Sequence, residues 1–510
     1  MFWVHSTADE LMKYAIIALD VGKTNKKIVV YDDEMRHLAF RIREIGTIRV
    51  EGFDVEDVDA IFKWFLGELK EFGRSFPIRV ITVSAQGATA VCVGADGRPS
   101  LPPIAYTNEV DVGVHKRFWA TMGDVHELQR LTATAEIKPL INLGKLLWFQ
   151  KEHWPEDFEQ TVHVLFFPQF FSYLLSGIAS ADITYTGCHT FLWDYSKNKW
   201  SFVVDKLGIR DMLPESPGLP HDGLGCISAA VASETGLATN TLVTLGIHDS
   251  NASLIPYLIS QKEDFLLNST GTWCVAMHPV KTVEFAPEEL GKMVYYNLSY
   301  RGDPVKTSIL LGGLEYSFYS NILMKRHGRS DWPVYDPAMY SSILKERQSF
   351  IFPTLMPGTG QFPNSMARVI DEGKVFLADD LVKGKQWPRV FENYLRGFAL
   401  ANLSLAIQTR VALRRVGLVP GTKMFIEGGF RHNKNYLALL GALLPDNPIY
   451  VTTLEEATSF GSALCAKSLV DGVALPSLAG YVNLNKQLVQ PAALLELENY
   501  ADAFMEYLDN

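Results

Sequence analysis

Apolar residues recur along the chain with two periods, and these periods predict alternating strands and helices. Short β-branched runs at 15–19 and 27–31 flank the polar stretch Asp-Val-Gly-Lys-Thr-Asn, a pattern typical of a β-hairpin. Residues 58–69 carry apolar side chains at every third or fourth position, which predicts an amphipathic helix. Residues 76–100 follow as two predicted strands with a loop between them. Further helices are predicted at 140–152 and 391–416.

A second block with the same organisation begins near residue 241. Two apolar runs, at 241–247 and 265–267, each end in small polar residues. Segments 424–444 and 448–470 each predict a strand, a turn and a helix. The chain therefore predicts an α/β protein made of two successive units. We place the boundary near residue 250, which divides the chain into 1–250 and 251–510.

Composition restricts the classes of partner. The formal net charge of −10 and the pI near 5.7 argue against a surface for nucleic acid or anionic membranes. The five cysteines are scattered and odd in number, which favours reduced core thiols in a cytoplasmic protein. The most apolar stretch, 164–179, is too short to span a membrane and predicts a core helix. Residues 1–14 lack the pattern of a signal peptide.

The tripeptide Gly22-Lys23-Thr24 is the one that ends a P-loop, but its context differs. A P-loop needs a glycine five residues earlier, where this chain has Ile17, and a helix afterwards, where it has a β-branched run. A tight hairpin turn remains, and its backbone N–H groups can bind an anion. Asp20 beside such an anion requires a cation such as Mg²⁺. The alternative is an exposed turn without chemistry.

The lysines of this hairpin leave two interpretations open. Lys23 either adds a charge to a bound phosphate or points into solvent with Lys26 and Lys27. For Lys26 we expect the solvated face.

Three other polar turns follow predicted strands. Asp249 and His248 end one strand, the hydroxyl-rich turn at 268–273 ends another, and Gly428-Gly429 lies between a strand and a helix. A glycine pair there allows a ligand to approach the backbone and the helix N-terminus closely. Each turn alone is typical of an ordinary loop. Four such turns at strand ends indicate a ligand site.

These turns, in this order, resemble those of the FGGY carbohydrate kinases of the actin/hexokinase/Hsp70-type ATPase superfamily. The stretches 143–152, 180–201 and 396–408 are similar to further motifs of the family, and the likeness runs from about 15 to 470. His248-Asp249 and the Ser-Thr-Gly-Thr-Trp turn are closest to the rhamnulokinase and fuculokinase branch. The chain departs from the family pattern in three places: Lys23, Asn142 and Phe430.

The resemblance implies two actin-like (ribonuclease H-like) domains with a catalytic cleft between them. It implies transfer of the γ-phosphoryl group of ATP to a sugar hydroxyl, with Asp249 accepting the hydroxyl proton. The residues implied for ATP are Gly22, Lys23, Thr24, Thr270, Gly271, Thr272, Gly428, Gly429 and Asn433. Those implied for the sugar are Gln86, Gly87, His248 and Asp249, and those implied for Mg²⁺ are Asp20 and Asp249.

The substrate stays open at this point, because sugar selectivity depends on a few hydroxyl contacts. L-Rhamnulose, L-fuculose and L-xylulose are the ketoses that fit the resemblance. A non-catalytic binding or regulatory protein on the same fold is the alternative, since fold does not fix function. A chaperone ATPase is disfavoured because no peptide-binding domain follows the second unit. A homodimer is expected at the level of the family.

Overall fold

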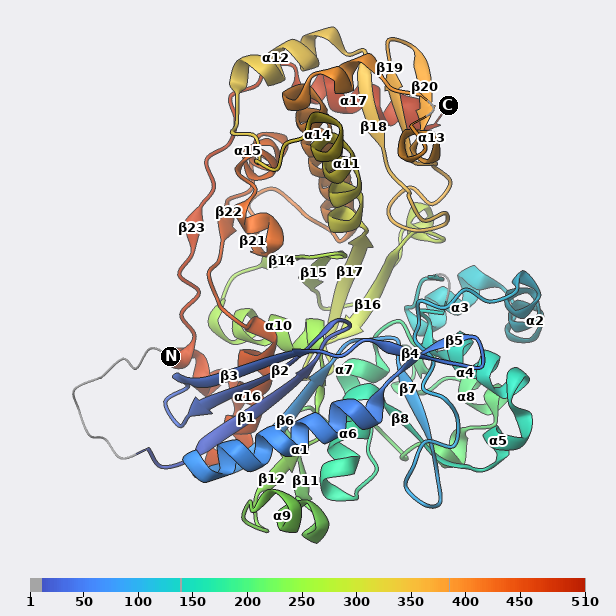
Figure 1. Ribbon diagram of the computed structural model, residues 1–510, viewed down its shortest axis with the longest axis vertical. Coiled ribbons are helices and arrows are strands. Elements are labelled where there is room, and N and C mark those ends of the chain that lie inside the picture. The colour runs from blue at the N-terminus through green and yellow to red at the C-terminus, as the bar shows by residue number, and fades with distance from the viewer. Residues whose placement is uncertain (1–11, 138–139, 385, 510) are drawn as a thin grey trace.

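The computed structural model describes residues 12–137, 140–384 and 386–509, and two seven-stranded sheets form its framework (Figure 1). Most of the segment before Ala15 lies outside the described residues. The first sheet has the order β11-β12-β6-β1-β2-β3, and β13 also pairs with β6. Its strands are β1 (Ala15–Val21), β2 (Asn25–Asp32), β3 (His37–Glu44), β6 (Ile78–Ala85), β11 (Gly223–Cys226), β12 (Leu242–Thr244) and β13 (Ile247–His248).

The second sheet has the order β16-β17-β15-β14-β21-β22-β23 and lies above the first in Figure 1. Its strands are β14 (Phe265–Thr270), β15 (Cys274–Pro279), β16 (Val294–Leu298), β17 (Pro304–Leu310), β21 (Lys423–Gly428), β22 (Ile449–Val451) and β23 (Gln487–Leu488). Smaller sheets are formed by β4 (Thr47–Val50) with β5 (Phe53–Glu56), β7 (Ala90–Gly94) with β8 (Thr161–Phe166), β9 (Trp193–Asp194) with β10 (Lys199–Trp200), and β18 (Ser349–Phe352) with β19 (Arg368–Asp371) and β20 (Lys374–Leu377).

The centres of the two sheets share one topology. In the first, β1, β2 and β3 pair antiparallel, and β6 joins β1 in parallel, followed by β12. In the second, β14, β15 and β17 pair antiparallel, and β21 joins β14 in parallel, followed by β22. The predicted pair of ribonuclease H-like units is confirmed. The β1–β2 turn and the β14–β15 turn therefore occupy equivalent positions.

Helices cover both faces of the first sheet, which explains why β1 is buried along its whole length. Ile17 and Leu19 pack in one apolar cluster with α1 (Val58–Ser75), on the side opposite to Ile16 and Ala18. Ile16 and Ala18 pack in another cluster with α10 (Asp249–Ser260) and α16 (Ala457–Asp471). The period of two in the sequence thus separates two different helical layers.

Helix α10 lies at the waist of the molecule, between the two sheets (Figure 1). Ala252 and Ile255 pack toward the first sheet, whereas Leu254 and Tyr257 pack with strands of the second. A helix with a partner on each side must be apolar on most of its surface, and the sequence of α10 meets that requirement. Its first residue, Asp249, is thereby fixed at the junction of the two units.

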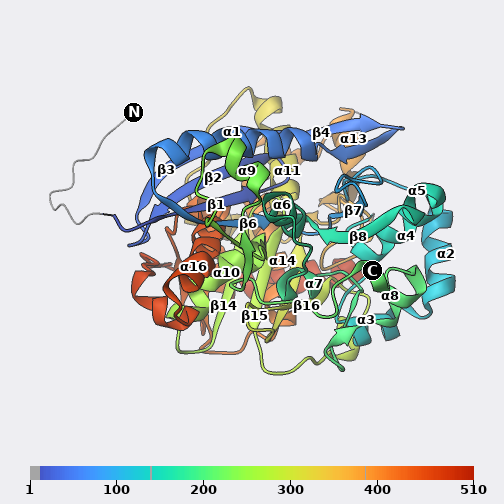
Figure 2. The ribbon, with the colours of Figure 1, turned by 90° about the horizontal axis from the view of Figure 1, so that it is seen from below.

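The other helices form side layers. Figure 2 shows α1 and α16 on opposite sides of the first sheet. The helices beside the first sheet are α2 (Val112–Met122), α3 (Val125–Thr132), α4 (Leu143–His153), α5 (Pro155–Glu159), α6 (Phe167–Ser176), α7 (Ile183–Thr186), α8 (Phe202–Leu207) and α9 (Ala229–Thr235). Those beside the second are α11 (Gly312–His327), α12 (Pro337–Glu346), α13 (Ala378–Val382), α14 (Tyr394–Arg415), α15 (Lys434–Leu443) and α17 (Leu497–Asp509).

Three expectations from the sequence need correction. The core helix expected at 164–179 is the end of strand β8 followed by α6, because Pro168 suits the first turn of a helix and not its interior. Four cysteines are buried free thiols as expected, but Cys226 is exposed on the edge strand β11. Lys26 is fully buried, and its ammonium donates to the carbonyls of Lys23 and Ile45. The prediction that Lys26 lies on a solvated face was therefore wrong.

No single helix in the described ranges is long and apolar enough to cross a membrane. One pair, α16 with the 3₁₀ helix Leu475–Tyr481, satisfies the length and composition together, although the two are bent by 117°.

Candidate active site

Two cavities meet at the junction of the two sheets. The first, of about 270 Å³, lies around the ends of β6, β13 and β14. The second, of about 750 Å³, lies between the end of β14 and the starts of α11 and α15. Thr270 and Gly271 line both. A molecule in one cavity can therefore face a molecule in the other across the β14–β15 turn.

Asp249 lines the first cavity, as predicted, and begins α10. Its Oδ1 accepts a hydrogen bond from the Ser250 backbone N–H at 2.6 Å, which fixes the carboxylate. The side chain keeps 32% of its surface exposed, so a ligand in the cavity can reach it.

Asp20 lies on β1, and its carboxylate accepts a hydrogen bond from the Ser84 hydroxyl at 3.1 Å. Burial raises the pKa of Asp20 to about 7; the Lys27 ammonium opposes this rise, and the Asp249 carboxylate adds to it. Two carboxylates that repel each other near a buried position suit a hard divalent cation, and Mg²⁺ prefers such oxygen ligands. The donor set at Asp20 and Asp249 therefore fits Mg²⁺.

The β1–β2 turn follows Asp20 directly, and its Lys23 side chain lies elsewhere than the sequence suggested. None of Gly22, Lys23 and Thr24 is among the residues that line either cavity. Thr24 is exposed at the turn. The Lys23 ammonium pairs with the buried Glu56 carboxylate at 2.5 Å. Neither alternative considered for Lys23 describes this geometry, because Glu56 comes from a distant strand.

The predicted sugar residues do gather in the first cavity. Gln86, Gly87 and His248 all line it. The Gln86 amide donates from Nε2 to Glu56 Oε1 at 3.1 Å, so Lys23 and Gln86 share one carboxylate. The other amide atom, Gln86 Oε1, is buried with no hydrogen-bond partner among the described residues. It is an acceptor available to a hydroxyl group.

Sequence reasoning missed the aromatic and imidazole wall of this cavity. The further lining residues are Tyr106, His189, Trp273 and Tyr295. Trp273 is the last residue of the predicted turn and could have been included. The others come from loops and strands whose proximity no local pattern indicates.

In the second cavity the structure brings together five of the predicted ATP residues, Thr270, Gly271, Thr272, Gly429 and Asn433. Gly428 lies next to them and has φ +79°. A Cβ on Gly428 would lie 1.9 Å from the Thr270 carbonyl oxygen, so only glycine lets β21 approach β14 this closely.

Asn433 caps α15, and each of its two amide atoms has a hydrogen-bond partner. Its Oδ1 accepts from the Tyr436 backbone N–H at 3.1 Å, and its Nδ2 donates to Asn402 at 2.8 Å. It therefore shapes the second cavity by holding the helix start in place.

A second glycine pair, Gly312-Gly313 at the start of α11, was also missed. Gly313, Leu314 and Ser317 line the second cavity. The signal was present, since this pair lies between a strand and a helix just as Gly428-Gly429 does. Part of the remaining wall is aromatic and is formed by Tyr316, Trp332, Tyr335 and Phe430.

Phe430 takes part in that wall directly. Its ring packs edge-on against Tyr316, with centroids 5.5 Å apart. The departure from the family pattern at this position thus adds an apolar face to the second cavity.

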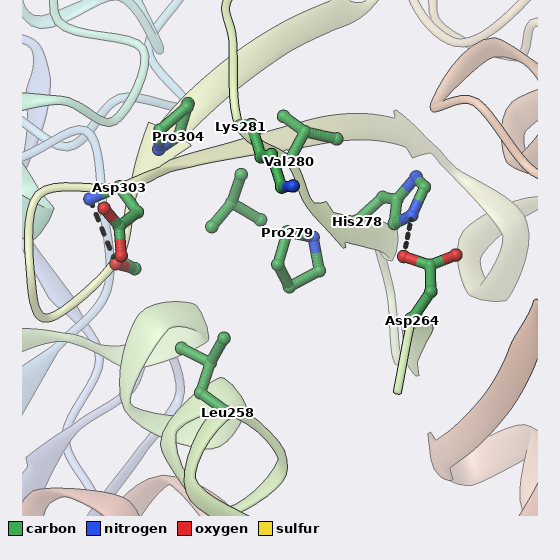
Figure 3. A pocket seen from close by; sticks show the side chains of 10 residues that line it. Leu258, Asp264, His278, Pro279, Val280, Lys281, Asp303 and Pro304 are labelled. Atoms are coloured by element: carbon green, nitrogen blue, oxygen red, sulfur yellow. Dashed lines mark hydrogen bonds and ion pairs between the residues drawn. The ribbon is translucent and has the colours of Figure 1, made fainter. Parts of the chain in front are cut away.

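A third hollow, of about 560 Å³, lies at the opposite end of α10 (Figure 3). Figure 3 shows Leu258 on one side and the His278–Asp264 pair, joined at 2.9 Å, on the other. Both nitrogens of the His278 ring are engaged locally, since Nδ1 also bonds the Val416 carbonyl. It shares no lining residue with the other two cavities. The candidate active site is therefore the pair of connected cavities.

Comparison with known proteins agrees with this geometry. Residues 15–256 match the N-terminal domain of the FGGY family of carbohydrate kinases, and residues 262–473 match the C-terminal domain, carbohydrate kinase FGGY. A carbohydrate kinase from Novosphingobium aromaticivorans superposes with a TM-score of 0.77 at 23% identity, covering 98% of this chain and 99% of that chain.

Two further solved structures have the same fold. A gluconate kinase from Lactobacillus acidophilus has a TM-score of 0.77 at 16% identity, and a ligand-bound xylulose kinase from the same organism has 0.77 at 15%. Each comparison covers 97% of both chains. Taken with the two family matches, which together span most of the sequence, these findings show that the chain belongs to the FGGY family of carbohydrate kinases.

Proposed function

We propose that this kinase transfers the γ-phosphoryl group of ATP to a hydroxyl of a small ketose bound in the 270 Å³ cavity. The observation that carries the proposal is the shared wall: Asp249 faces one cavity, and Thr270 and Gly271 border both. The larger cavity has the aromatic faces and helix N-termini that suit a nucleotide. The smaller one has the size and polar groups of a sugar site.

Asp249 is the proposed base. Ser250 N–H holds its Oδ1, and the carboxylate can accept the proton of the attacking hydroxyl while the new bond to phosphorus forms. His248 lies with Nε2 3.3 Å from the same Oδ1 and can orient the sugar hydroxyl. Phosphoryl transfer depends mainly on positioning and charge stabilisation, so the protein needs little more than this arrangement.

Mg²⁺ would be held by Asp20 and Asp249 and would supply neutralisation of the phosphate charge. The backbone at Gly22 and at Gly271 would border the phosphates from the two sheets. For Lys23 we now propose a role at the sugar cavity, through Glu56 and Gln86, in place of a phosphate contact.

The substrate candidates are L-rhamnulose, L-fuculose and L-xylulose. These candidates depend on the assignment to the rhamnulokinase and fuculokinase branch, which is based only on His248-Asp249 and the Ser-Thr-Gly-Thr-Trp turn. A panel of ketoses and polyols in a coupled ADP-release assay tests the proposal. Sugar-dependent ADP release is expected; its absence with every sugar, alongside retained ATP binding, would favour the non-catalytic regulatory protein.

Asp249→Asn tests the base. The variant is nearly isosteric and keeps the acceptor for Ser250 N–H, so it should fold and bind ATP. Turnover should fall by about 10²–10⁴-fold, the usual contribution of a general base. Turnover close to that of the wild-type protein in a folded Asp249→Asn sample would contradict the assignment.

The wider organisation is also proposed. We assign the sugar and the first phosphate hairpin to residues 1–250 and the nucleotide to 251–510, a division supported by the two family matches. Free cysteines and a net charge of −10 support a cytoplasmic protein without nucleic-acid or membrane partners. A homodimer is proposed from the family alone.

A further inference from the structure

Three side chains of the metal-ligating type converge behind the first cavity. Cys188, His189 and His248 each offer one ligand atom, and these atoms all lie within 4.8 Å of one another. All three residues are buried. Cys188 and His189 follow the short helix α7, whereas His248 ends β13, so the fold and not a local motif brings them together.

Hydrogen bonds around His248 determine which ring nitrogen carries the proton. Asn251 donates from Nδ2 to the Leu298 carbonyl at 2.8 Å, so its Oδ1 must be an acceptor. His248 Nδ1 lies 2.8 Å from that Oδ1 and is therefore the donor. In the neutral ring, Nε2 then carries a lone pair, and it lies 3.7 Å from Cys188 Sγ.

This is the outer-shell arrangement of a metal-binding histidine. Such a residue donates its second N–H to an oxygen acceptor, which fixes the ring and directs the other nitrogen at the metal. Asn251 supplies that acceptor and is itself anchored to Leu298.

His189 is held in an unusual backbone conformation, with φ 43°. A non-glycine residue in this region carries a strain that commonly accompanies function. Its Nδ1 is buried and has no hydrogen-bond partner in the described part of the chain. This nitrogen is not the ring atom that faces His248 beside Gly87, which is Nε2.

Gly87 shows where the two imidazoles converge. A Cβ placed on Gly87 would lie 2.8 Å from Nε2 of both His189 and His248. That space is open because residue 87 has no side chain, and it belongs to the cavity that Gly87, His189 and His248 line together.

We propose that Cys188, His189 and His248 form a binding site for a thiophilic divalent transition metal such as Zn²⁺, entered through the sugar cavity. Thiolate and imidazole are the ligands that Zn²⁺ selects, whereas Mg²⁺ prefers oxygen. On binding, the Cys188 thiol gives its proton to solvent. Asp249 Oδ1, 3.3 Å from His248 Nε2, completes a set of four.

The separations are compatible with a tetrahedral ion. Zn–N and Zn–S bonds of about 2.0–2.3 Å place tetrahedral ligand atoms roughly 3.3–3.8 Å apart. The Cys188–His248 and His248–Asp249 pairs already fall near this range. Ligand atoms that are up to 4.8 Å apart need to close by about 1 Å, within reach of side-chain rotation.

The position of this site predicts its effect, and this step rests on the proposed function. A metal held there occupies the sugar cavity and engages the proposed base, Asp249. It should inhibit phosphoryl transfer in competition with the sugar and without competing with ATP. Excess Mg²⁺ should not displace it.

Co²⁺ titration of the full chain, without ATP or sugar, tests the site directly. Tetrahedral Co²⁺ with a thiolate ligand is expected to give a near-ultraviolet charge-transfer band and intense visible bands, and Zn²⁺ should abolish both. Cys188→Ser should remove the charge-transfer band. It should also weaken Zn²⁺ binding by at least about 100-fold, since loss of an outer-shell partner alone costs about 10–100-fold.

Cys226→Ser is the matched control, because Cys226 is the exposed free thiol. It should leave the bands and Zn²⁺ affinity within about twofold. His189→Asn serves as a second ligand variant if Cys188→Ser does not fold, and it should also weaken Zn²⁺ binding. Bands that survive in the ligand variants, or that disappear in Cys226→Ser, would overturn the site.

Inhibition is measured in a separate experiment with the sugar that supports turnover. Zn²⁺ should raise the KM for the sugar and leave the KM for ATP unchanged, and a chelator should reverse the effect. Zn²⁺ competition with ATP would overturn the placement in the sugar cavity. If no sugar supports turnover, the Co²⁺ titration still decides the metal site, so the two failures are distinguishable.

Discussion

Replacement of Asp20 by Asn should stabilise the ligand-free protein, and the gain should appear only as the pH rises. Burial, with the added charge of Asp249, raises the pKa of Asp20 from 3.8 to about 7. Below about pH 4 the group carries a proton in both the folded and unfolded chains. Between pH 4 and 7 the unfolded chain loses that proton first, so the folded state loses stability as the pH rises.

The size of the effect follows from the same values. A rise from 3.8 to about 7, at about 1.36 kcal/mol per pKa unit, corresponds to about 4 kcal/mol as an upper limit. Asn removes the charge but can still accept the hydrogen bond from Ser84. The variant should therefore equal the wild-type protein near pH 4 and exceed it by up to about 4 kcal/mol at pH 8.

Thermal unfolding measured between pH 4 and 8, without ATP, sugar or divalent cations, provides the assay. A gain of this size corresponds to roughly 10 °C in the midpoint for a domain of about 150–250 residues. Glu34→Gln is the matched control, because Glu34 is an exposed carboxylate on the turn after β2. A midpoint difference that stays constant over this range would refute the reasoning, since it would mean that burial does not disfavour the Asp20 carboxylate.

Two further predictions concern the phosphate and sugar sides of the site. Gly428→Ala should lower the unfolding midpoint, because its Cβ would lie 1.9 Å from the Thr270 carbonyl oxygen and a side chain at φ +79° alone costs about 1–3 kcal/mol. Gly429→Ala is the control, since the nearest atom to its Cβ lies 3.9 Å away. Equal midpoints for the two variants would contradict this expectation. Lys23→Met should raise the KM for the sugar about tenfold, the typical effect of losing about 1.4 kcal/mol, because it leaves Glu56 without its ammonium partner. A rise in the KM for ATP that exceeds the rise in the KM for the sugar would contradict this expectation and favour a contact between Lys23 and the phosphates.

Much of the fold was predictable because it depends on short-range patterns. The hairpin at β1–β2, helix α1 and the strand–turn–helix units near the C-terminus all follow from local periods of two and 3.6. The failure at 164–179 has a local cause as well. A continuous apolar run does not distinguish a buried strand from a buried helix, and Pro168 marks the change between them.

The charged residues of the site show where local reasoning ends. Lys23 and Lys26 stand in a polar turn, and nothing near them in the sequence indicates a buried partner. Glu56 lies 33 residues from Lys23, and the Ile45 carbonyl lies 19 residues from Lys26. The contacts of these two lysines are a consequence of how β1, β2 and the following loops pack, which no pattern within the turn encodes.

The sequence by itself determined the two α/β units, the four polar turns at strand ends and the carboxylates Asp20 and Asp249, since strand ends and turn residues are local properties. Only the tertiary structure decided that Gly313 at the start of α11 lines the second cavity, that Lys23 faces Glu56, and that Cys188 and His189 meet His248. Those contacts join residues far apart in the chain. They depend on α10 packing between two sheets, and that packing is a property of the whole core.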